Sequence, residues 1–98
     1  MIYVVAEVDL KPGHFAEIEA AAHTVAEATR KEDGCISYVC HQPMGEPDRI
    51  VFVERWRDRD ALQAHFTQPH MGVWQKALKG HVEGRNIEII HPEKVETL

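Results

Sequence analysis

The sequence predicts an α+β protein with a ferredoxin-like, split β-α-β arrangement and a four-stranded antiparallel sheet. Two observations lead to this prediction. Strand-like segments and segments with helical periodicity follow one another in the order β-α-β-β-α-β, with the second helix interrupted at Pro69. The chain has 98 residues, enough for a single hydrophobic core. We therefore expect one domain over residues 1–98.

The first half of the chain predicts a strand, a helix and a second strand. Residues 2–9 are rich in β-branched residues, and a Lys-Pro-Gly turn follows at 11–13. From residue 14 to about 31, apolar residues recur every three or four positions, which indicates a helix with one narrow buried stripe. That stripe consists of Phe15, Ile18, Ala22, Val25 and Thr29. Gly34 is expected to end the segment in a left-handed conformation, and residues 35–42 form the second strand.

Both cysteines of the chain lie in this second strand. Cys35 and Cys40 are five residues apart, so a regular strand would direct their side chains to opposite faces. That arrangement is poor geometry for a disulfide bridge. We therefore expect two reduced thiols.

The second half of the chain predicts a hairpin, a broken helix and a last strand. Residues 43–48 contain two prolines and a glycine and form the hairpin loop, and residues 49–56 form the third strand. Asp58 is a suitable N-cap for a short helix. Pro69 ends that helix and fits the first turn of the next one, which runs to about residue 79. The last strand covers about residues 84–91.

Charge and motif content exclude several classes of partner and cofactor. The net charge is −5 and no basic run occurs, so we expect neither a nucleic-acid nor a membrane partner. No run of about 20 apolar residues is present, and the N-terminus has no signal-peptide pattern, so we expect a cytoplasmic protein. There is no C-x-x-C, H-x-H or Gly-rich phosphate loop, and the seven histidines are scattered along the sequence. We therefore expect no metal, flavin or haem.

Two strands predict a homodimer. Residues 2–6 and 50–53 are apolar at both odd and even positions. A sheet with one solvated face alternates between apolar and polar residues, so both faces of this sheet are expected to be buried. Helices cover one face, and a second copy of the chain is the simplest cover for the other.

Candidate catalytic residues lie between Glu54 and His70. The third strand ends in a Glu-x-Trp-x-Asp pattern, in which Glu54 and Trp56 share one face. The short helix that follows places His65 on its apolar side. Trp56 and His65 are expected at opposite ends of one pocket wall. A buried histidine is often structural, and Glu54 could simply bind a helix N-terminus, so the residues alone leave both roles open.

The order and spacing of these patterns resemble the antibiotic biosynthesis monooxygenase domains, especially the quinol monooxygenase-like members. The resemblance rests on Gly34-Cys35-x-x-Tyr38, the Glu54-to-His70 block and the Lys-Pro-Gly turn, and it extends over nearly the whole chain. It implies a dimeric α+β barrel in which two sheets pack together and the helices lie outside. It also implies oxidation of a small hydroquinone or phenol by dioxygen without a cofactor.

The resemblance also directs attention to a pocket. A deprotonated dihydroxyaromatic can itself pass an electron to dioxygen, so the protein must supply an apolar cavity and a proton acceptor. His65 and Glu54 are the expected catalytic residues, because an imidazole suits a general base near neutral pH. His41 is a further polar candidate. The substrate-binding residues are expected to be Tyr38, Phe52, Trp56, Phe66, His70, Met71 and Trp74.

Three other functions are alternatives to this oxidation. Haem-degrading relatives carry Asn, Trp and His where this chain has residue 6 or 7, His65 and about Gln75, so haem oxygenation is disfavoured. Isomerases of small phosphorylated signal molecules share the acidic-aromatic corner, and their anionic substrate would need cations such as Arg55 or Arg57. A non-catalytic dimeric module that binds hydrophobic small molecules is the third possibility. The last two stay open.

Overall fold

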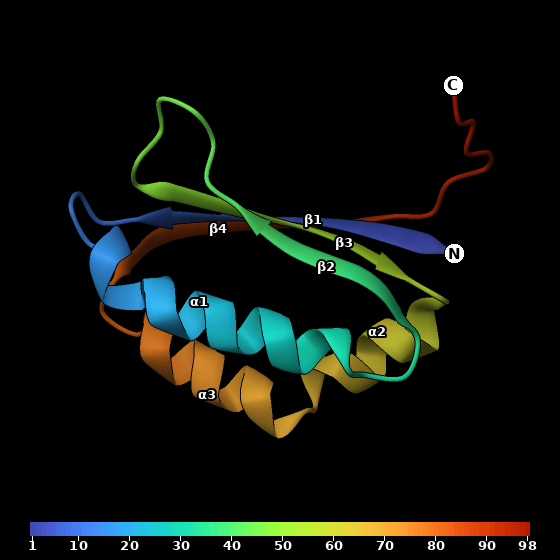
Figure 1. The fold of residues 1–98 in the computed structure, drawn as a ribbon, viewed down its shortest axis with the longest axis horizontal. Coiled ribbons are helices and arrows are strands. Elements are labelled where there is room, and N and C mark those ends of the chain that lie inside the picture. The colour runs from blue at the N-terminus through green and yellow to red at the C-terminus, as the bar shows by residue number, and fades with distance from the viewer.

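Four strands form one antiparallel sheet, and three helices cover one of its faces (Figure 1). The structure is a computed structural model that describes all residues 1–98. The elements follow in the order β1 (Ile2–Leu10), α1 (Phe15–Arg30), β2 (Cys35–His41), β3 (Arg49–Trp56), α2 (Arg59–Phe66), α3 (Pro69–Leu78) and β4 (Val82–Ile90). The strand order in the sheet is β2-β3-β1-β4. This confirms the predicted ferredoxin-like α+β fold, including the second helix broken in two.

The local signals that predicted the helix boundaries are confirmed. Asp58 caps α2, and its carboxylate accepts a hydrogen bond of 2.8 Å from the backbone N–H of Ala61. Pro69 occupies the first turn of α3. Gly34 has a φ of +86°, the left-handed region that favours glycine. None of the three helices combines the length and apolarity needed to cross a bilayer.

The hydrophobic core lies between the sheet and the helices. Along β1 every second residue is buried, from Ile2 to Leu10, and β3 shows the same alternation from Ile50 to Trp56. Helix α1 contributes Ile18, Ala22 and Val25, as the predicted stripe requires, and α3 contributes Trp74 and Leu78. The polar members of this buried layer are Thr29, Glu54 and His65.

Helices α1 and α3 run antiparallel and meet at both ends. His70, in the first turn of α3, contacts Glu32, which follows the end of α1. His81, beyond the end of α3, contacts His14, which immediately precedes α1. Figure 1 shows the two helices side by side beneath the sheet. Glu32, His65 and His70 form the inner cluster, and His14, Glu17 and His81 form the outer cluster.

The other face of the sheet is not covered by any element of the chain (Figure 1). An apolar row crosses its centre, because Val53 pairs with Val5 on one side and Val39 on the other. Charged residues surround that row, among them Glu7, Asp9, Arg49 and Arg55. The open face is thus apolar at its centre and charged around it, and the prediction that a second copy buries this face stays untested. The homodimer stays a prediction.

The cysteine prediction is partly wrong. Cys35 and Cys40 are both free thiols, but both pack against the same core rather than facing opposite sides. The reason is an irregularity in β2, whose register against β3 shifts between Cys35 and Ser37. An interrupted alternation brings residues five apart to one face. Burial raises the pKa of each thiol to about 11, so both are protonated near neutral pH.

Candidate active site

His65 lies at the centre of the polar groups that the core contains. The short helix α2 turns Ala61, Leu62 and His65 inward, as the helical spacing predicted. The His65 side chain is almost fully buried, at 2% exposure. Its ring lies against aromatic neighbours, with centroid distances of 4.7 Å to Trp56 and 5.6 Å to Tyr38. Trp56 and His65 are therefore in direct contact, and the prediction that they lie at opposite ends of a wall is wrong.

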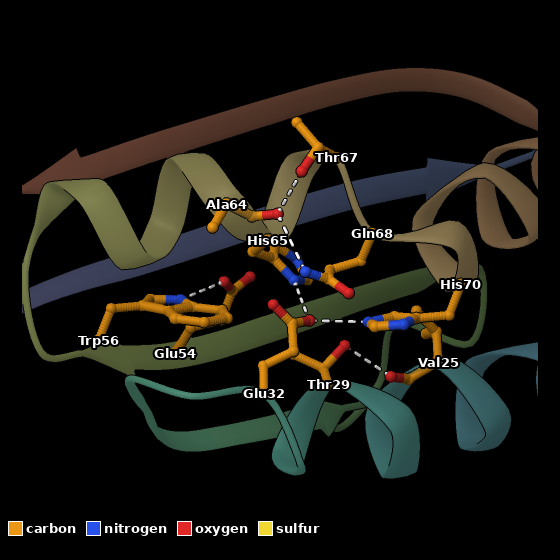
Figure 2. Close-up of polar contacts among 10 residues, drawn as sticks. All are labelled: Val25, Thr29, Glu32, Glu54, Trp56, Ala64, His65, Thr67, Gln68 and His70. Carbon is orange, nitrogen blue, oxygen red and sulfur yellow. Dashed lines mark hydrogen bonds and ion pairs between the residues drawn. The ribbon is translucent and has the colours of Figure 1, made fainter.

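One carboxylate oxygen holds two histidines. Glu32 Oε2 lies 2.7 Å from His65 Nδ1 and 2.7 Å from His70 Nε2 (Figure 2). Since a carboxylate only accepts hydrogen bonds, each of these nitrogens must carry a proton. Neutral His65 is then the Nδ1–H tautomer, with its lone pair on Nε2. No group of the chain forms a hydrogen bond with that Nε2, so it is free to bind a ligand atom.

Glu32 is the member of this inner cluster that the sequence did not reveal. It stands in the turn after α1, 33 residues before His65, and no motif connects the two. Its position is set by the local structure, because the chain turns between α1 and β2 at Gly34, next to Ala61 of α2. A Cβ on Gly34 would lie 2.6 Å from the Ala61 Cβ, so the backbone there approaches α2 as closely as glycine permits.

The electrostatics of His65 favour the neutral imidazole. Burial lowers its pKa from 6.5, while the hydrogen bond and the negative charge of Glu32 act in the opposite direction. Burial is the larger effect, so the free nitrogen is available as a base at neutral pH.

Glu54 is the second buried titratable group. Only 4% of the residue is exposed, and its Oε1 accepts a 2.9 Å hydrogen bond from Trp56 Nε1. Burial raises the pKa of Glu54 to about 7, and the Trp56 hydrogen bond acts against that rise. The sequence left open that this carboxylate binds a helix N-terminus, but its hydrogen-bond donor is the Trp56 indole. A carboxyl group with this pKa exchanges protons close to neutral pH.

A small apolar pocket of about 50 Å³ lies between the sheet and helices α2 and α3. Most of the predicted site residues line it. Its lining consists of Val4, Ala6, Val8, Tyr38, Phe52, Glu54, His65, Phe66, Met71, Trp74, Gln75, Leu78, Arg85 and Ile87. Pockets that enclose small-molecule ligands usually measure roughly 300–1,000 Å³. The pocket must therefore widen before it can enclose an aromatic ligand.

Three predicted polar or aromatic residues lie elsewhere. Trp56 is fully buried and sits behind Glu54 and His65, where it supports them without lining the pocket. His70 is outside the apolar lining and belongs to a separate hollow near Glu32. His41 lies along another groove, between α1 and β2. The sequence could not indicate that Trp56 is buried, His70 partly buried and His41 exposed.

The separate hollow is open and polar, with a volume of about 580 Å³. Its lining includes Glu32, His70, Lys31, Asp33, Arg57, Asp60 and Gln68. The inner cluster therefore connects two different environments. His65 faces the apolar pocket, while Glu32 and His70 face the hollow that opens to solvent.

The inner cluster has the composition of a metal site, since Glu32, His65 and His70 offer three ligand atoms within 4.8 Å of one another. Its distances suit protons better than a metal. Ligands of a tetrahedral Zn²⁺ at about 2.0–2.1 Å lie roughly 3.3 Å from each other. Both His–Glu contacts measure 2.7 Å, the length of charge-assisted hydrogen bonds. The arrangement is a carboxylate shared by two N–H donors.

The chain matches known proteins in sequence. A family model described as antibiotic biosynthesis monooxygenase matches residues 1–77. The chain is 34% identical to the probable quinol monooxygenase YgiN of Escherichia coli strain K12, over 94% of this chain and 98% of that protein.

Solved structures agree in fold. The structure of an antibiotic biosynthesis monooxygenase superposes with a TM-score of 0.90 at 24% identity, covering 96% of this chain and 100% of the other. A protein from Shewanella oneidensis superposes with a TM-score of 0.86 at 29% identity, covering 93% and 89%. The similarity thus extends over nearly the whole chain.

Proposed function

The chain belongs to the antibiotic biosynthesis monooxygenase family, and from this membership we propose that it oxidises a small hydroquinone or related phenol with dioxygen. The proposed reaction uses no metal, flavin or haem. The observation that supports it best is the free Nε2 of a buried, neutral His65, oriented by Glu32 and facing an apolar pocket. Similarity to a protein named as a probable quinol monooxygenase supports the substrate class.

The substrate supplies the electrons in this reaction. Loss of a proton from one hydroxyl gives a phenolate, which is electron-rich enough to reduce dioxygen. A hydroquinone and one O₂ then give a hydroxyquinone and one water, so one oxygen atom enters the ring and the other leaves as water. The protein's task is to remove protons and to exclude bulk water.

We assign the first proton transfer to His65. Its Nε2 accepts the phenolic proton, and the resulting imidazolium is stabilised by the Glu32 carboxylate at 2.7 Å from Nδ1. Glu32 also binds His70, which lies beside the open hollow. This line of groups gives the proton a path from the pocket to solvent, with Glu32 and His70 in positioning and relay roles.

We propose that Glu54 exchanges a proton with the second hydroxyl of the substrate. It lines the same pocket as His65, and its pKa of about 7 lets it take up or release a proton during turnover at neutral pH. Tyr38 lines the pocket as a neutral phenol, because burial raises its pKa. It can therefore donate a hydrogen bond to a bound oxygen.

Entry of the substrate requires the pocket to widen on the side of α2 and α3. Phe66 is 43% exposed although it lines the pocket, so its ring can rotate toward solvent without disturbing the packing of the core. Met71 is partly buried next to it, and an unbranched methionine side chain adapts to a new neighbour at low cost. These two residues form the proposed gate.

The charge of the lining bears on the isomerase alternative. Arg85 is the one permanently cationic side chain among the lining residues, and its main partner is Gln75 on α3. Arg55 binds Ser37, while Arg57 lies beside Asp33 and Asp58. A phosphorylated substrate would have to place its anion near Glu54 with little compensation. The lining therefore favours an apolar aromatic substrate.

The decisive experiment measures oxygen uptake with a panel of hydroquinones and catechols, with aerobic and anaerobic arms. His65→Ala should lower kcat by roughly 10²- to 10⁴-fold, the usual contribution of a positioned base. The loss should shrink at high pH, where the substrate ionises unaided. His23→Ala, at an exposed position of α1, is the matched control and should leave turnover unchanged. Tight binding of hydroquinones without oxygen uptake would instead support the non-catalytic binding module.

A homodimer through the open sheet face completes the proposal. The apolar row of Val5, Val39 and Val53 would be buried against the same row of a second copy. Light scattering at micromolar concentration should give twice the monomer mass, and Val53→Asp should convert the protein to a monomer. A stable folded monomer for the unmodified chain would remove this part of the proposal.

A further inference from the structure

A second group of two histidines and one glutamate lies at the other end of the α1–α3 pair. This outer cluster consists of His14, Glu17 and His81, whose ligand atoms all lie within 4.8 Å of one another. His14 Nδ1 and His81 Nδ1 are 2.9 Å apart, and His81 Nδ1 is 3.5 Å from Glu17 Oε2. The seven histidines are scattered along the sequence but partly grouped in space, so their sequence spacing does not exclude a metal site.

In the outer cluster two imidazole nitrogens, His14 Nδ1 and His81 Nδ1, face each other. Each Nδ1 can be a donor or an acceptor, and in the neutral pair one of them must donate to the other. Neither nitrogen has a carboxylate at hydrogen-bond distance, because Glu17 lies at 3.5 Å and is more than half exposed. The three ligand atoms thus converge without the shared carboxylate that holds the inner cluster together.

The spacing of these atoms fits a metal ion. Ligands at about 2.0–2.2 Å in a tetrahedral site are separated by roughly 3.3–3.5 Å. The observed His81–Glu17 separation of 3.5 Å matches the upper end of that range, and the His14–His81 separation of 2.9 Å would have to widen by a few tenths of an ångström through small side-chain rotations. Two imidazoles and one carboxylate are a donor set that Zn²⁺ accepts, with water in the fourth position.

The backbone keeps both halves of the outer cluster in place. The N–H of His14 binds the carbonyl of Lys11, and the N–H of Lys11 binds the carbonyl of His81 at 2.9 Å. The N–H of His81 in turn binds the carbonyl of Leu78, at the end of α3. The start of α1 and the turn before β4 are therefore joined before any ion binds, so little order has to be gained on binding.

We propose that the outer cluster is a binding site for a divalent transition metal of the Zn²⁺ type, with His14, Glu17 and His81 as ligands. The ion clamps the start of α1 to the end of α3, and it stabilises the folded protein rather than taking part in oxidation. The ligand residues are partly exposed, and the N-terminus of α1 carries a partial positive charge that repels a cation. Both effects limit the affinity to that of a reversible surface site. The proposal is independent of the monooxygenase reaction.

The test is a Zn²⁺ titration of the untagged protein by calorimetry, with a thermal melt at each metal concentration. One ion should bind per chain and the Tm should rise. His81→Ala should weaken Zn²⁺ binding by at least roughly tenfold. Loss of a residue that only orients a metal ligand already weakens binding by about that factor, so loss of a ligand should cost no less. His23→Ala, which removes an exposed histidine outside the cluster, should bind Zn²⁺ as the unmodified protein does.

A second variant separates the two clusters. His70→Ala removes one histidine of the inner cluster and should leave Zn²⁺ binding unchanged. If His70→Ala abolishes binding while His81→Ala retains it, the ion belongs to the inner cluster and the proposal is overturned. Absence of Zn²⁺ binding at micromolar concentration by the unmodified protein overturns it as well. Cobalt substitution adds a direct readout, because ligand-field bands should appear in the unmodified protein and be lost in His14→Ala.

Discussion

The inner and outer clusters have the same composition, two histidines and one glutamate, and lie at opposite ends of the same pair of helices. They differ in where the carboxylate stands and in how deeply it is buried. Glu32 is 7% exposed and lies between His65 and His70, whereas Glu17 is 62% exposed and lies to one side of a His–His contact. The same three residue types are therefore proposed to transfer protons in one place and to bind a cation in the other.

From this difference we infer that the environment of such a group, more than its residue types, decides its role. In the low-dielectric interior a charge-assisted hydrogen bond is strong and its loss is costly. At the surface the same contact competes with water and is worth little. Replacing matched residues in the two clusters should make this contrast measurable.

The largest effect is expected from the residue that supports the inner cluster from behind. Trp56→Ala should lower the free energy of unfolding by roughly 3–5 kcal/mol, because the side chain is fully buried and contacts both Glu54 and His65. The outer cluster has no comparable support. Urea unfolding monitored by circular dichroism measures the change, and a loss below 1 kcal/mol would mean that the core closes over the missing indole.

The next effect depends on pH and on Glu54. Its pKa is about 7 in the folded protein against 4.5 as its ordinary value, so the folded state holds a proton that the unfolded state releases first. The stability linked to this proton is fully present below pH 4.5 and is lost as the pH rises through about 7. The difference between these pKa values corresponds to roughly 3 kcal/mol.

Glu54→Gln should remove this contribution while keeping an acceptor for the Trp56 indole. The variant should gain stability relative to the unmodified protein as the pH is raised from 4.5 to 8. His65 acts in the opposite sense, since burial lowers its pKa from 6.5 and stability is lost as the pH falls below that value. That contribution is present in both proteins and cancels in the comparison. Parallel denaturation curves with a constant difference at every pH would contradict the raised pKa of Glu54.

The smallest effects compare the two glutamates directly. Glu32→Gln should lower the free energy of unfolding by roughly 1.5–3 kcal/mol, because it removes the charge from two buried hydrogen bonds. Glu17→Gln should change it by no more than about 0.5 kcal/mol in the absence of metal, as is usual for an exposed side chain. Thermal melts in the presence of a chelator provide the measurement. Equal effects of the two substitutions would remove the distinction between the clusters.

Local sequence patterns were sufficient for the fold and for part of the site. Alternation along β1 and β3, the Asp58 cap and Pro69 each act over a few residues, so a sequence pattern could predict them. The same holds for the inward orientation of His65 and Glu54. The fold class and half of the residues that line the pocket followed from these signals together with the family resemblance.

What the sequence could not predict depends on contacts between distant segments. Glu32 and His65 are 33 residues apart, and His14 and His81 are 67 apart, so no spacing relates them. The common side of Cys35 and Cys40 results from a register shift that a regular strand pattern does not contain. The depth of Trp56 behind the pocket likewise depends on how α2 packs onto β3.

The break between α2 and α3 has a consequence for the geometry of the inner cluster. Successive residues of an uninterrupted α-helix are rotated by about 100°, so two positions five residues apart point about 140° away from each other. His65 and His70 are five apart, yet both reach one oxygen atom, because the chain changes direction at Gln68 before Pro69 starts the next helix. Insertions or deletions at residues 67–69 would therefore disconnect His70 from Glu32 while leaving His65 on its helix. We therefore expect the proposed proton path to be more sensitive to changes of chain length in this linker than to substitutions within it.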